Sequence, residues 1–237
     1  MSTGYLNQIK QEAYEVNIAI VKEKLVILTW GNASAIDRDK GIFAIKPSGV
    51  AYSLLKWQDM VIVDLDGKVI DSKLKPSSDT LTHLEIYKGF NLVGGIVHTH
   101  SPWATIWAQS CKSIPVLGTT HSDHFNGEVP CLPYLNKDKV KSAYEKEIGI
   151  QIVNFFIEQK LEPIHMTACL LSGHASFTWG ETSKKAFENA VALEACAQMA
   201  YHSLTLNPKV EFPKYILEKH FTRKHGDKAY YGQNTKL

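Results

Sequence analysis

The sequence lacks the features that mark secreted, membrane-spanning or nucleic-acid-binding proteins. No apolar run approaches the roughly 20 residues that a membrane-spanning helix needs. The first twenty residues lack the charged, apolar and small-residue order of a signal peptide. The formal net charge is only +2, and lysine and arginine are scattered among acidic residues, so no basic stripe for nucleic acid is formed. We therefore expect a cytoplasmic protein without membrane or nucleic-acid partners.

Cysteine is scarce, and internal repeats and linkers are missing. The four cysteines are spread singly, without a CxxC pair, at Cys111, Cys131, Cys169 and Cys196. Such cysteines are usually packing residues, and we give a nucleophilic role little weight. No repeat, low-complexity tract or Pro/Ser-rich linker interrupts the chain. With 237 residues, 44% of them hydrophobic, the sequence predicts one domain spanning residues 1–237.

Hydrophobic periodicity predicts an α/β chain. Helices are predicted at about 6–20, 81–90, 102–109, 139–158, 183–202 and 215–224. Strands are predicted at 25–30, 42–45, 60–63, 68–70, 94–100, 168–171 and 176–179. Asp66-Gly67 between two apolar runs predicts a two-residue hairpin loop. This pattern favours three α/β/α layers, in which a central, mainly antiparallel sheet is flanked by helices on both faces.

Two histidines end the apolar run that begins at Gly94-Gly95. Because side chains alternate along a strand, His98 and His100 point to the same face and are able to hold one metal ion. Strand-end histidines are also common as packing or surface residues. His174 and Asp79 would complete a set of three imidazoles and one carboxylate with an open position, although His174 is equally well an isolated loop residue. Such ligands suit Zn, Mn, Co or Ni.

Three turns of small polar residues indicate a site for an anion. They are Gly31-Asn32, Ser48-Gly49 and Ser77-Ser78. Ser77 and Ser78 precede a predicted helix, where free N–H groups and the helix dipole favour a phosphate. Each turn taken alone is more often a plain turn or helix cap. Lys46, beside the second turn, either adds a charge to the site or is a solvated surface lysine.

Candidates for proton transfer lie in segments without a packing pattern. Asp123 lies in a polar loop, and Tyr231 lies in the tail. Glu145 lies on a predicted helix face and is equally well a solvated residue. The basic segment 219–225 either holds a second anionic group or forms a basic helix end, which the helix dipole favours.

With these residues in view, the sequence resembles the sugar-phosphate 4-epimerases of the class II aldolase/epimerase superfamily from about Leu6 to Gln233. The matching stretches are 28–32, 45–50, 75–80, 94–101, 117–123 and 223–233. The resemblance implies a nine-stranded, mainly antiparallel sheet between helices, and a fourfold-symmetric homotetramer with active sites at subunit interfaces. It also implies that L-ribulose 5-phosphate and D-xylulose 5-phosphate interconvert by retro-aldol cleavage of C3–C4, rotation of the aldehyde and re-addition.

The resemblance also assigns roles to individual residues. It implies one zinc ion per subunit, replaceable by other divalent metals, with the ligands Asp79, His98, His100 and His174. It implies substrate and phosphate contacts from Gly31, Asn32, Ser48, Gly49, Ser77 and Ser78. It makes Asp123 and Tyr231 the two acid–base residues. An aspartate at position 79 is the epimerase pattern, because L-fuculose-1-phosphate aldolase-like relatives carry glutamate there.

The sequence departs from this family in three places. Residues 122–125 read Ser-Asp-His-Phe instead of Ala-Asp-Tyr-Phe, and Ala175-Ser176 follow His174 where Gly-Pro is usual. Residues 234–237 extend past the usual end. None of these changes removes a functional side chain. The alternatives are a metal-dependent sugar-phosphate aldolase and a non-catalytic metal- or sugar-phosphate-binding module. Relatives from arabinose and from ascorbate utilisation resemble each other too closely for the residues to choose between them.

Overall fold

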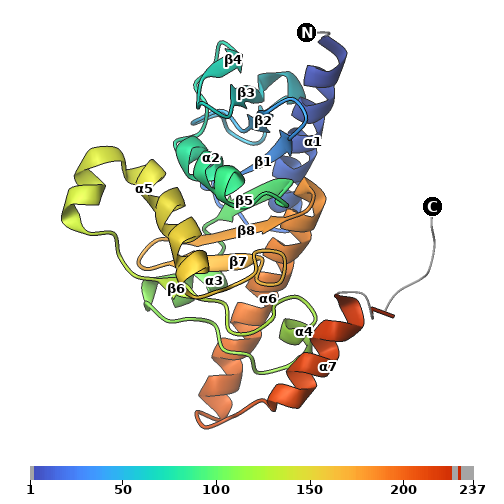
Figure 1. Ribbon diagram of the computed structural model, residues 1–237, viewed down its shortest axis with the longest axis vertical. Coiled ribbons are helices and arrows are strands. Elements are labelled where there is room, and N and C mark those ends of the chain that lie inside the picture. Colours follow the sequence, from blue (N-terminus) through green and yellow to red (C-terminus); the bar gives the residue numbers. More distant parts are fainter. Residues whose placement is uncertain (1–2, 226–228, 231–237) are drawn as a thin grey trace.

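The computed structural model describes residues 3–225 and 229–230 (Figure 1). Its helices are α1 (Thr3–Lys22), α2 (Thr80–Gly89), α3 (Pro102–Gln109), α4 (Thr119–Ser122), α5 (Lys137–Glu158), α6 (Ser183–Leu206) and α7 (Lys214–Lys224), with one 3-10 turn, η1 (Trp57–Asp59). Its strands are β1 (Asn32–Asp37), β2 (Ile42–Ile45), β3 (Val61–Asp64), β4 (Val69–Asp71), β5 (Gly95–Thr99), β6 (Cys131–Leu132), β7 (Ala168–Leu171) and β8 (Ser176–Gly180). None of the helices in this part of the chain has the length and apolar character needed to cross a membrane.

The strands form one sheet in the order β4-β3-β2-β1-β5-β8-β7-β6. Neighbouring strands are antiparallel except for β6 and β7, which are parallel, so the sheet is mixed. The prediction of a mainly antiparallel sheet is confirmed. The described residues contain eight strands, where the resemblance implies nine. The extra detail that the sequence did not predict is the short parallel edge strand β6.

Two hydrophobic cores pack against the sheet, and at β2 they lie on its opposite faces. Along β2, Phe43 and Ile45 belong to the core that contains the inner faces of α2 and α5. Ile42 and Ala44 alternate with them and belong to the core beneath α1 and the first turns of α6. Figure 1 shows α2 and α5 on one side of the sheet and α1 and α6 on the other. The predicted three-layer arrangement is therefore confirmed.

The prediction of a strand at residues 25–30 is wrong. This segment is irregular, and its turn is closed by the N–H of Trp30, which donates to the carbonyl of Ile27 at 3.0 Å. Leu28 has a φ of +55° and is 75% exposed. The strand begins after Gly31, whose φ is +113° and where an added Cβ would lie 2.8 Å from the carbonyl oxygen of His98. The apolar residues predicted a strand, but only the less apolar segment that follows pairs with β5.

Two local predictions also need correction. The predicted hairpin forms between β3 and β4, and Gly67 has a φ of +83°, but the connection comprises residues 65–68 rather than Asp66-Gly67 alone. Serine is a favoured N-cap residue, which would place Ser77 or Ser78 at the start of helix α2, but the N-cap position is occupied by Asp79. Its side chain makes no cap hydrogen bond, which leaves the carboxylate available for other partners. The other predicted helices and strands are confirmed within a few residues of their predicted ends.

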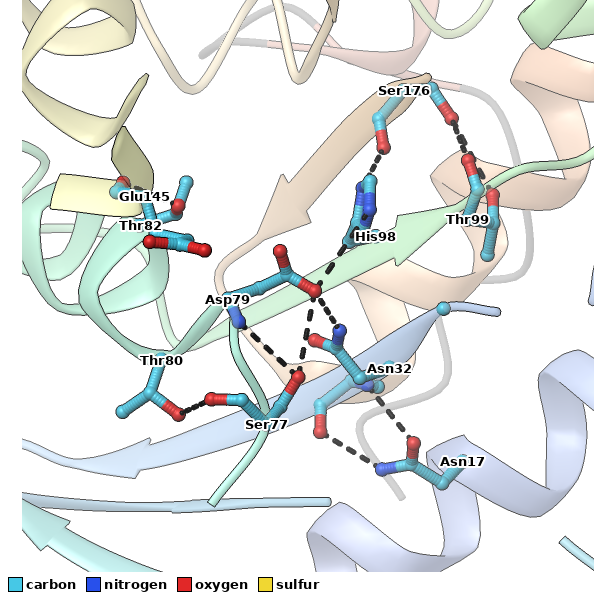
Figure 2. A network of polar contacts seen from close by, with 12 residues as sticks. Asn17, Asn32, Ser77, Asp79, Thr80, Thr82, His98, Thr99, Glu145 and Ser176 are labelled. Atoms are coloured by element: carbon cyan, nitrogen blue, oxygen red, sulfur yellow. Dashed lines mark hydrogen bonds and ion pairs between the residues drawn. The ribbon is translucent and has the colours of Figure 1, made fainter. Parts of the chain in front are cut away.

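A buried asparagine ties α1 to the start of β1. The Asn17 side chain has no exposed surface, and its amide nitrogen donates to the carbonyls of Ala13 and Ala33 at 2.8 and 2.9 Å. Its oxygen accepts from the N–H of Ala33 at 3.0 Å (Figure 2). The Asn17 amide therefore hydrogen-bonds both the N–H and the carbonyl of Ala33, the residue next to Asn32.

Replacing this amide tests its contribution to the fold. Asn17→Ala leaves the buried N–H and carbonyl of Ala33 without their side-chain partner, so we expect the free energy of unfolding to fall by about 2–4 kcal/mol. Urea denaturation followed by circular dichroism measures the change. Asn7→Ala, at an exposed position of the same helix, is the matched control and should change stability by less than about 0.5 kcal/mol. Equal effects of the two substitutions would contradict this role.

Candidate active site

Three histidines converge at one end of β5. His98 lies on the strand, His100 follows its end, and His174 lies in the turn between β7 and β8. Their ligand nitrogens all lie within 4.8 Å of one another. The ring centroid of His98 is 5.0 Å from that of His100 and 5.1 Å from that of His174. The altered Ala175-Ser176 sequence therefore still brings His174 to the predicted pair.

The hydrogen bonding of these histidines leaves nitrogens for a metal. Nδ1 of His98 lies 2.9 Å from the carbonyl oxygen of Ser176, which can only accept, so Nδ1 carries the proton and Nε2 keeps its lone pair. The ring stacks on Phe177 with the centroids 4.2 Å apart. Nδ1 of His174 is buried and has no hydrogen-bond partner among the described residues. Buried polar atoms of this kind are stabilised by a ligand, so the donor set fits a divalent metal ion.

Asp79 supplies a carboxylate beside the histidines. Its Oδ2 lies 4.0 Å from Nε2 of His98 and accepts a hydrogen bond from the side-chain amide of Asn32 at 2.7 Å (Figure 2). The hydroxyl of Ser77 lies 3.5 Å from the same oxygen. Burial opposes ionisation of Asp79, but the neighbouring His98 and His83 and the bond from Asn32 outweigh it, so the pKa of this carboxyl is lowered.

The imidazoles are uncharged near neutral pH. Burial lowers the pKa of His98, and the charge of His100 adds to this effect. Burial lowers the pKa of His174 to about 4, with a smaller contribution from His98. The pKa of His100 is also lowered, by burial and then by His174. Metal ligation requires neutral imidazole and ionised carboxylate, and the site holds its groups in these states.

A row of polar contacts between α2 and β1 continues along the helix from the carboxylate of Asp79. Asp79, His83 and Tyr87 follow one another at single-turn spacing and share one face of α2. The hydroxyl of Ser34 lies 2.7 Å from Nδ1 of His83 and 2.7 Å from the hydroxyl of Tyr87. Burial lowers the pKa of His83 to about 3, so this residue is neutral. Sequence reasoning missed this row, although the spacing of Asp79, His83 and Tyr87 is a signal that would have found one side of it.

The predicted metal and anion residues share one cavity of about 540 Å³. Its lining contains all ten of them: Gly31, Asn32, Ser48, Gly49, Ser77, Ser78, Asp79, His98, His100 and His174. Thr29, Trp30, Lys46 and Pro47 complete the lining. The three small polar turns, which lie far apart in the sequence, therefore surround the same space as the histidines.

Two of these turns are joined by their backbones. The N–H of Ser48 donates to the carbonyl of Lys75, and the N–H of Ser77 donates to the carbonyl of Lys46, both at 3.0 Å. Lys46 is only 2% exposed, and its ammonium group donates to the carbonyl of Val50 at 2.8 Å. Burial lowers the pKa of Lys46. The interpretation of Lys46 as a solvated surface residue is therefore wrong, because its side chain helps to hold the second turn.

Asp123 lies outside this cavity in its own chain. It follows α4 and binds the end of α7, where the guanidinium of Arg223 donates to both carboxylate oxygens at 3.0 and 2.6 Å. Nδ1 of His220 lies 3.1 Å away. Partial burial opposes ionisation, but Arg223, His220 and Lys224 outweigh it and lower the pKa of Asp123. The anionic group that segment 219–225 holds is thus the chain's own Asp123.

The other two acid–base candidates, Tyr231 and Glu145, are not among the described residues that line the cavity. Tyr231 lies outside the described residues. The backbone carbonyl of Glu145 accepts a hydrogen bond from Thr82 at 2.6 Å, and Glu145 does not line the cavity (Figure 2).

Comparison with known proteins places the chain in a family. Residues 11–201 match the family model described as the class II aldolase and adducin N-terminal domain. The chain is 45% identical over 229 residues to the L-ribulose-5-phosphate 4-epimerase UlaF of Salmonella paratyphi B, covering 96% of this chain and 100% of that protein. The UlaF protein of Salmonella paratyphi A is equally similar.

Solved structures share the fold. An L-fuculose 1-phosphate aldolase superposes with a TM-score of 0.74 at 24% identity, over 93% of this chain and 96% of that one. The L-fuculose-1-phosphate aldolase of Thermus thermophilus gives 0.68 at 24% identity, over 86% and 98% of the two chains. The family itself is shown by the sequence matches to the family model and to the two relatives. The chain therefore belongs to the class II aldolase family.

Proposed function

We propose that the protein is an L-ribulose-5-phosphate 4-epimerase, an isomerase that interconverts L-ribulose 5-phosphate and D-xylulose 5-phosphate. The observation that carries the proposal is the shared cavity, in which three histidines and Asp79 face the three small polar turns. Relatives with that activity in their names match at 45% identity over nearly the whole chain. We also propose that the chain forms one domain and works in the cytoplasm.

The proposed metal is one zinc ion per subunit, for which other divalent ions substitute. Asp79, His98, His100 and His174 would hold it. When bound, zinc supplies a Lewis acid that stabilises the negative charge on the ketone and adjacent hydroxyl oxygens of the substrate. The lowered pKa values of these residues favour neutral imidazoles and an ionised carboxylate, which are the states that bind a metal ion. The bond from Asn32 directs one oxygen of Asp79 towards His98.

The small polar turns are proposed to hold the substrate phosphate. The N–H groups of Ser48 and Ser77 are used to join the two turns. The Ser77 hydroxyl lies near Asp79, so the remaining donors are the hydroxyls of Ser48 and Ser78 and the N–H groups of Gly49 and Ser78. The Gly31-Asn32 turn lines the same cavity. Gly49 has a φ of +69° and open space where a Cβ would be, so the backbone can approach a phosphate closely.

C4 of the substrate is not adjacent to the carbonyl, so simple enolisation cannot invert it. Removal of the C4 hydroxyl proton lets the C3–C4 bond break, and its electron pair passes to the former ketone, giving dihydroxyacetone enediolate and glycolaldehyde phosphate. Rotation of the aldehyde and attack by the enediolate on its opposite face reform the bond, and the C4 oxygen regains a proton. Because the C4 oxygen points in different directions before and after the aldehyde rotates, a proton-transfer group is needed on each side, and we assign these roles to Asp123 and Tyr231.

The position of Asp123 supports a site shared between subunits. Its carboxylate lies against α7 and does not line the cavity of its own chain. We therefore propose a fourfold-symmetric homotetramer in which Asp123 and Tyr231 reach the cavity of a neighbouring subunit. Whether the pathway is that of arabinose or ascorbate does not alter this chemistry.

A coupled assay tests the function directly. Purified, zinc-loaded protein and L-ribulose 5-phosphate should produce D-xylulose 5-phosphate, measured through a D-xylulose 5-phosphate-dependent coupling enzyme. Accumulation of free glycolaldehyde phosphate and dihydroxyacetone instead would show an aldolase that releases its fragments. Saturable binding of the sugar phosphate without either product would show a non-catalytic binding module.

The metal assignment is tested with His98→Asn. This substitution removes one of four proposed ligands, so we expect zinc content to fall from about one ion per chain to near zero, while circular dichroism stays unchanged. Elemental analysis of dialysed protein measures the content. His202→Asn, at an exposed position, is the control and should retain the metal. Undiminished zinc in His98→Asn, or full activity of metal-free protein after chelation, would refute the assignment.

The acid–base assignment is tested with Tyr231→Phe. Loss of the phenolic hydroxyl should lower kcat by about 100-fold or more with little change in KM, since the hydroxyl transfers a proton in the transition state. Tyr230→Phe is a matched control, because the neighbouring ring is 64% exposed. A kcat of Tyr231→Phe within a factor of a few of the wild type would remove this residue from the mechanism.

A further inference from the structure

A second cavity lies at the other end of β8. This strand begins at Ser176, beside the metal histidines, and ends at Gly180, which lines the second cavity of about 250 Å³. Basic residues from four separate segments meet there: His124, His165, Lys185, Lys224 and His225. Glu181 is the one acidic residue in the lining. The cavity is therefore rich in positive and hydrogen-bonding groups that the proposed reaction does not use.

The arrangement of these groups favours an anion over a metal ion. Among the described residues, the only group of three or more potential ligands compact enough to hold a metal is the one at His98. The two lysines also repel cations. Burial first, and then the charges of Lys224 and Lys185, lower the pKa of His124. The same lysines contribute to a lowered pKa of His225, after burial. An anion among these groups would relieve their mutual repulsion.

A buried hydroxyl in the lining lacks a partner. Thr167 is only 8% exposed, and its Oγ1 makes no hydrogen bond to the described residues. Its backbone carbonyl is used, because it accepts from the N–H of Trp179 at 3.0 Å. A buried hydroxyl without a partner is costly, and Thr167 is one of the residues that line the cavity, so a ligand oxygen that reached this hydroxyl would satisfy it.

One of the lysines is held only weakly. The ammonium of Lys185 lies 3.2 Å from the carboxylate of Glu188 one turn along α6, and both side chains are more than 40% exposed. Exposed pairs of this kind contribute little, so the ammonium can turn towards a ligand. The ammonium of Lys224, in contrast, forms an ion pair with Oδ2 of Asp123 at 3.4 Å, and Nε2 of His225 lies 3.0 Å from the Asp123 carbonyl oxygen.

We propose that this cavity is a second binding site, for a small phosphate-bearing anion, formed by Lys185, the Thr167 hydroxyl and the surrounding histidines. The site is separate from the metal cavity and does not depend on the proposed reaction. Because Lys224 and His225 contact both this cavity and Asp123, the bound anion adjoins the residues that hold the Asp123 loop. Its volume accommodates inorganic phosphate or a short organic phosphate.

Calorimetric titration at constant ionic strength tests the proposal. Inorganic phosphate and glycerol 3-phosphate are used as separate probes, and tighter binding of the second would identify an organic phosphate as the better ligand. Lys185→Gln should weaken phosphate binding about tenfold, since it removes one charge-assisted hydrogen bond. Lys184→Gln, which removes the same charge from an exposed neighbour outside the cavity, should change it less than about twofold.

A second variant tests the orphaned hydroxyl. Thr167→Val keeps the shape but removes the hydroxyl, so the phosphate-free protein should be as stable as the wild type or more stable, while phosphate affinity falls. An unchanged affinity for phosphate in Thr167→Val and Lys185→Gln would overturn the proposal, as would absence of binding at millimolar phosphate.

The same titrations separate this site from the turn cavity. Phosphate binding that survives Ser78→Ala but weakens in Lys185→Gln belongs to the second cavity. Binding that is lost in Ser78→Ala and untouched by Lys185→Gln belongs to the turn cavity alone, which supports the proposed substrate site and refutes this one.

Discussion

The position of helix α2 on the sheet is the constraint on which the whole site depends. The hydrogen bond from Asn32 to Asp79, and the hydroxyl of Ser34 between His83 and Tyr87, hold this helix against β1 at 2.7 Å contacts. Asn32 also lies opposite His98 in the pairing of β1 with β5. Asn32 therefore both binds the carboxylate of Asp79 and pairs with the strand residue that carries the His98 imidazole. A buried carboxylate needs such partners, because an unpaired one would be strongly destabilising.

The two ends of β8 carry opposite chemistry. At its start, the carbonyl of Ser176 orients His98, and burial keeps the three histidines neutral beside one ionised carboxylate, an arrangement suited to a cation. At its end, two lysines and three histidines line a small cavity whose lining contains one acidic residue, Glu181, an arrangement that favours an anion. Asp123 adjoins the second of these regions, bound by the basic end of α7. The proposed metal site and the proposed anion site thus lie at opposite ends of the same strand.

The parts of the site that local patterns encode were predictable. The period of two along a strand placed His98 and His100 on one face, and small polar residues marked the three turns. His174 and Asp79 were candidates from their residue types alone, and because no spacing connects them to the pair, only the family resemblance implied that they share its metal ion. The contact of Ser34 with His83 was not predictable, because it requires knowing which face of α2 meets which face of β1. The segment around Leu28 was predicted as a strand because its residues are apolar. Apolar content indicates a tendency to be buried, but a strand forms only where the backbone pairs with a neighbouring strand, and here only the segment after Gly31 does so.

The central claim is that this cavity breaks and reforms the C3–C4 bond of a sugar phosphate. Heavy-atom isotope effects on epimerisation test it most directly, with ¹³C placed at C3 or C4 of L-ribulose 5-phosphate and deuterium placed at C4 in a separate substrate. A retro-aldol reaction predicts a normal ¹³C effect at both carbons and no primary deuterium effect, because the C4–H bond stays intact. A primary deuterium effect without a ¹³C effect at C3 would show that the C4–H bond is broken instead, and would contradict the account.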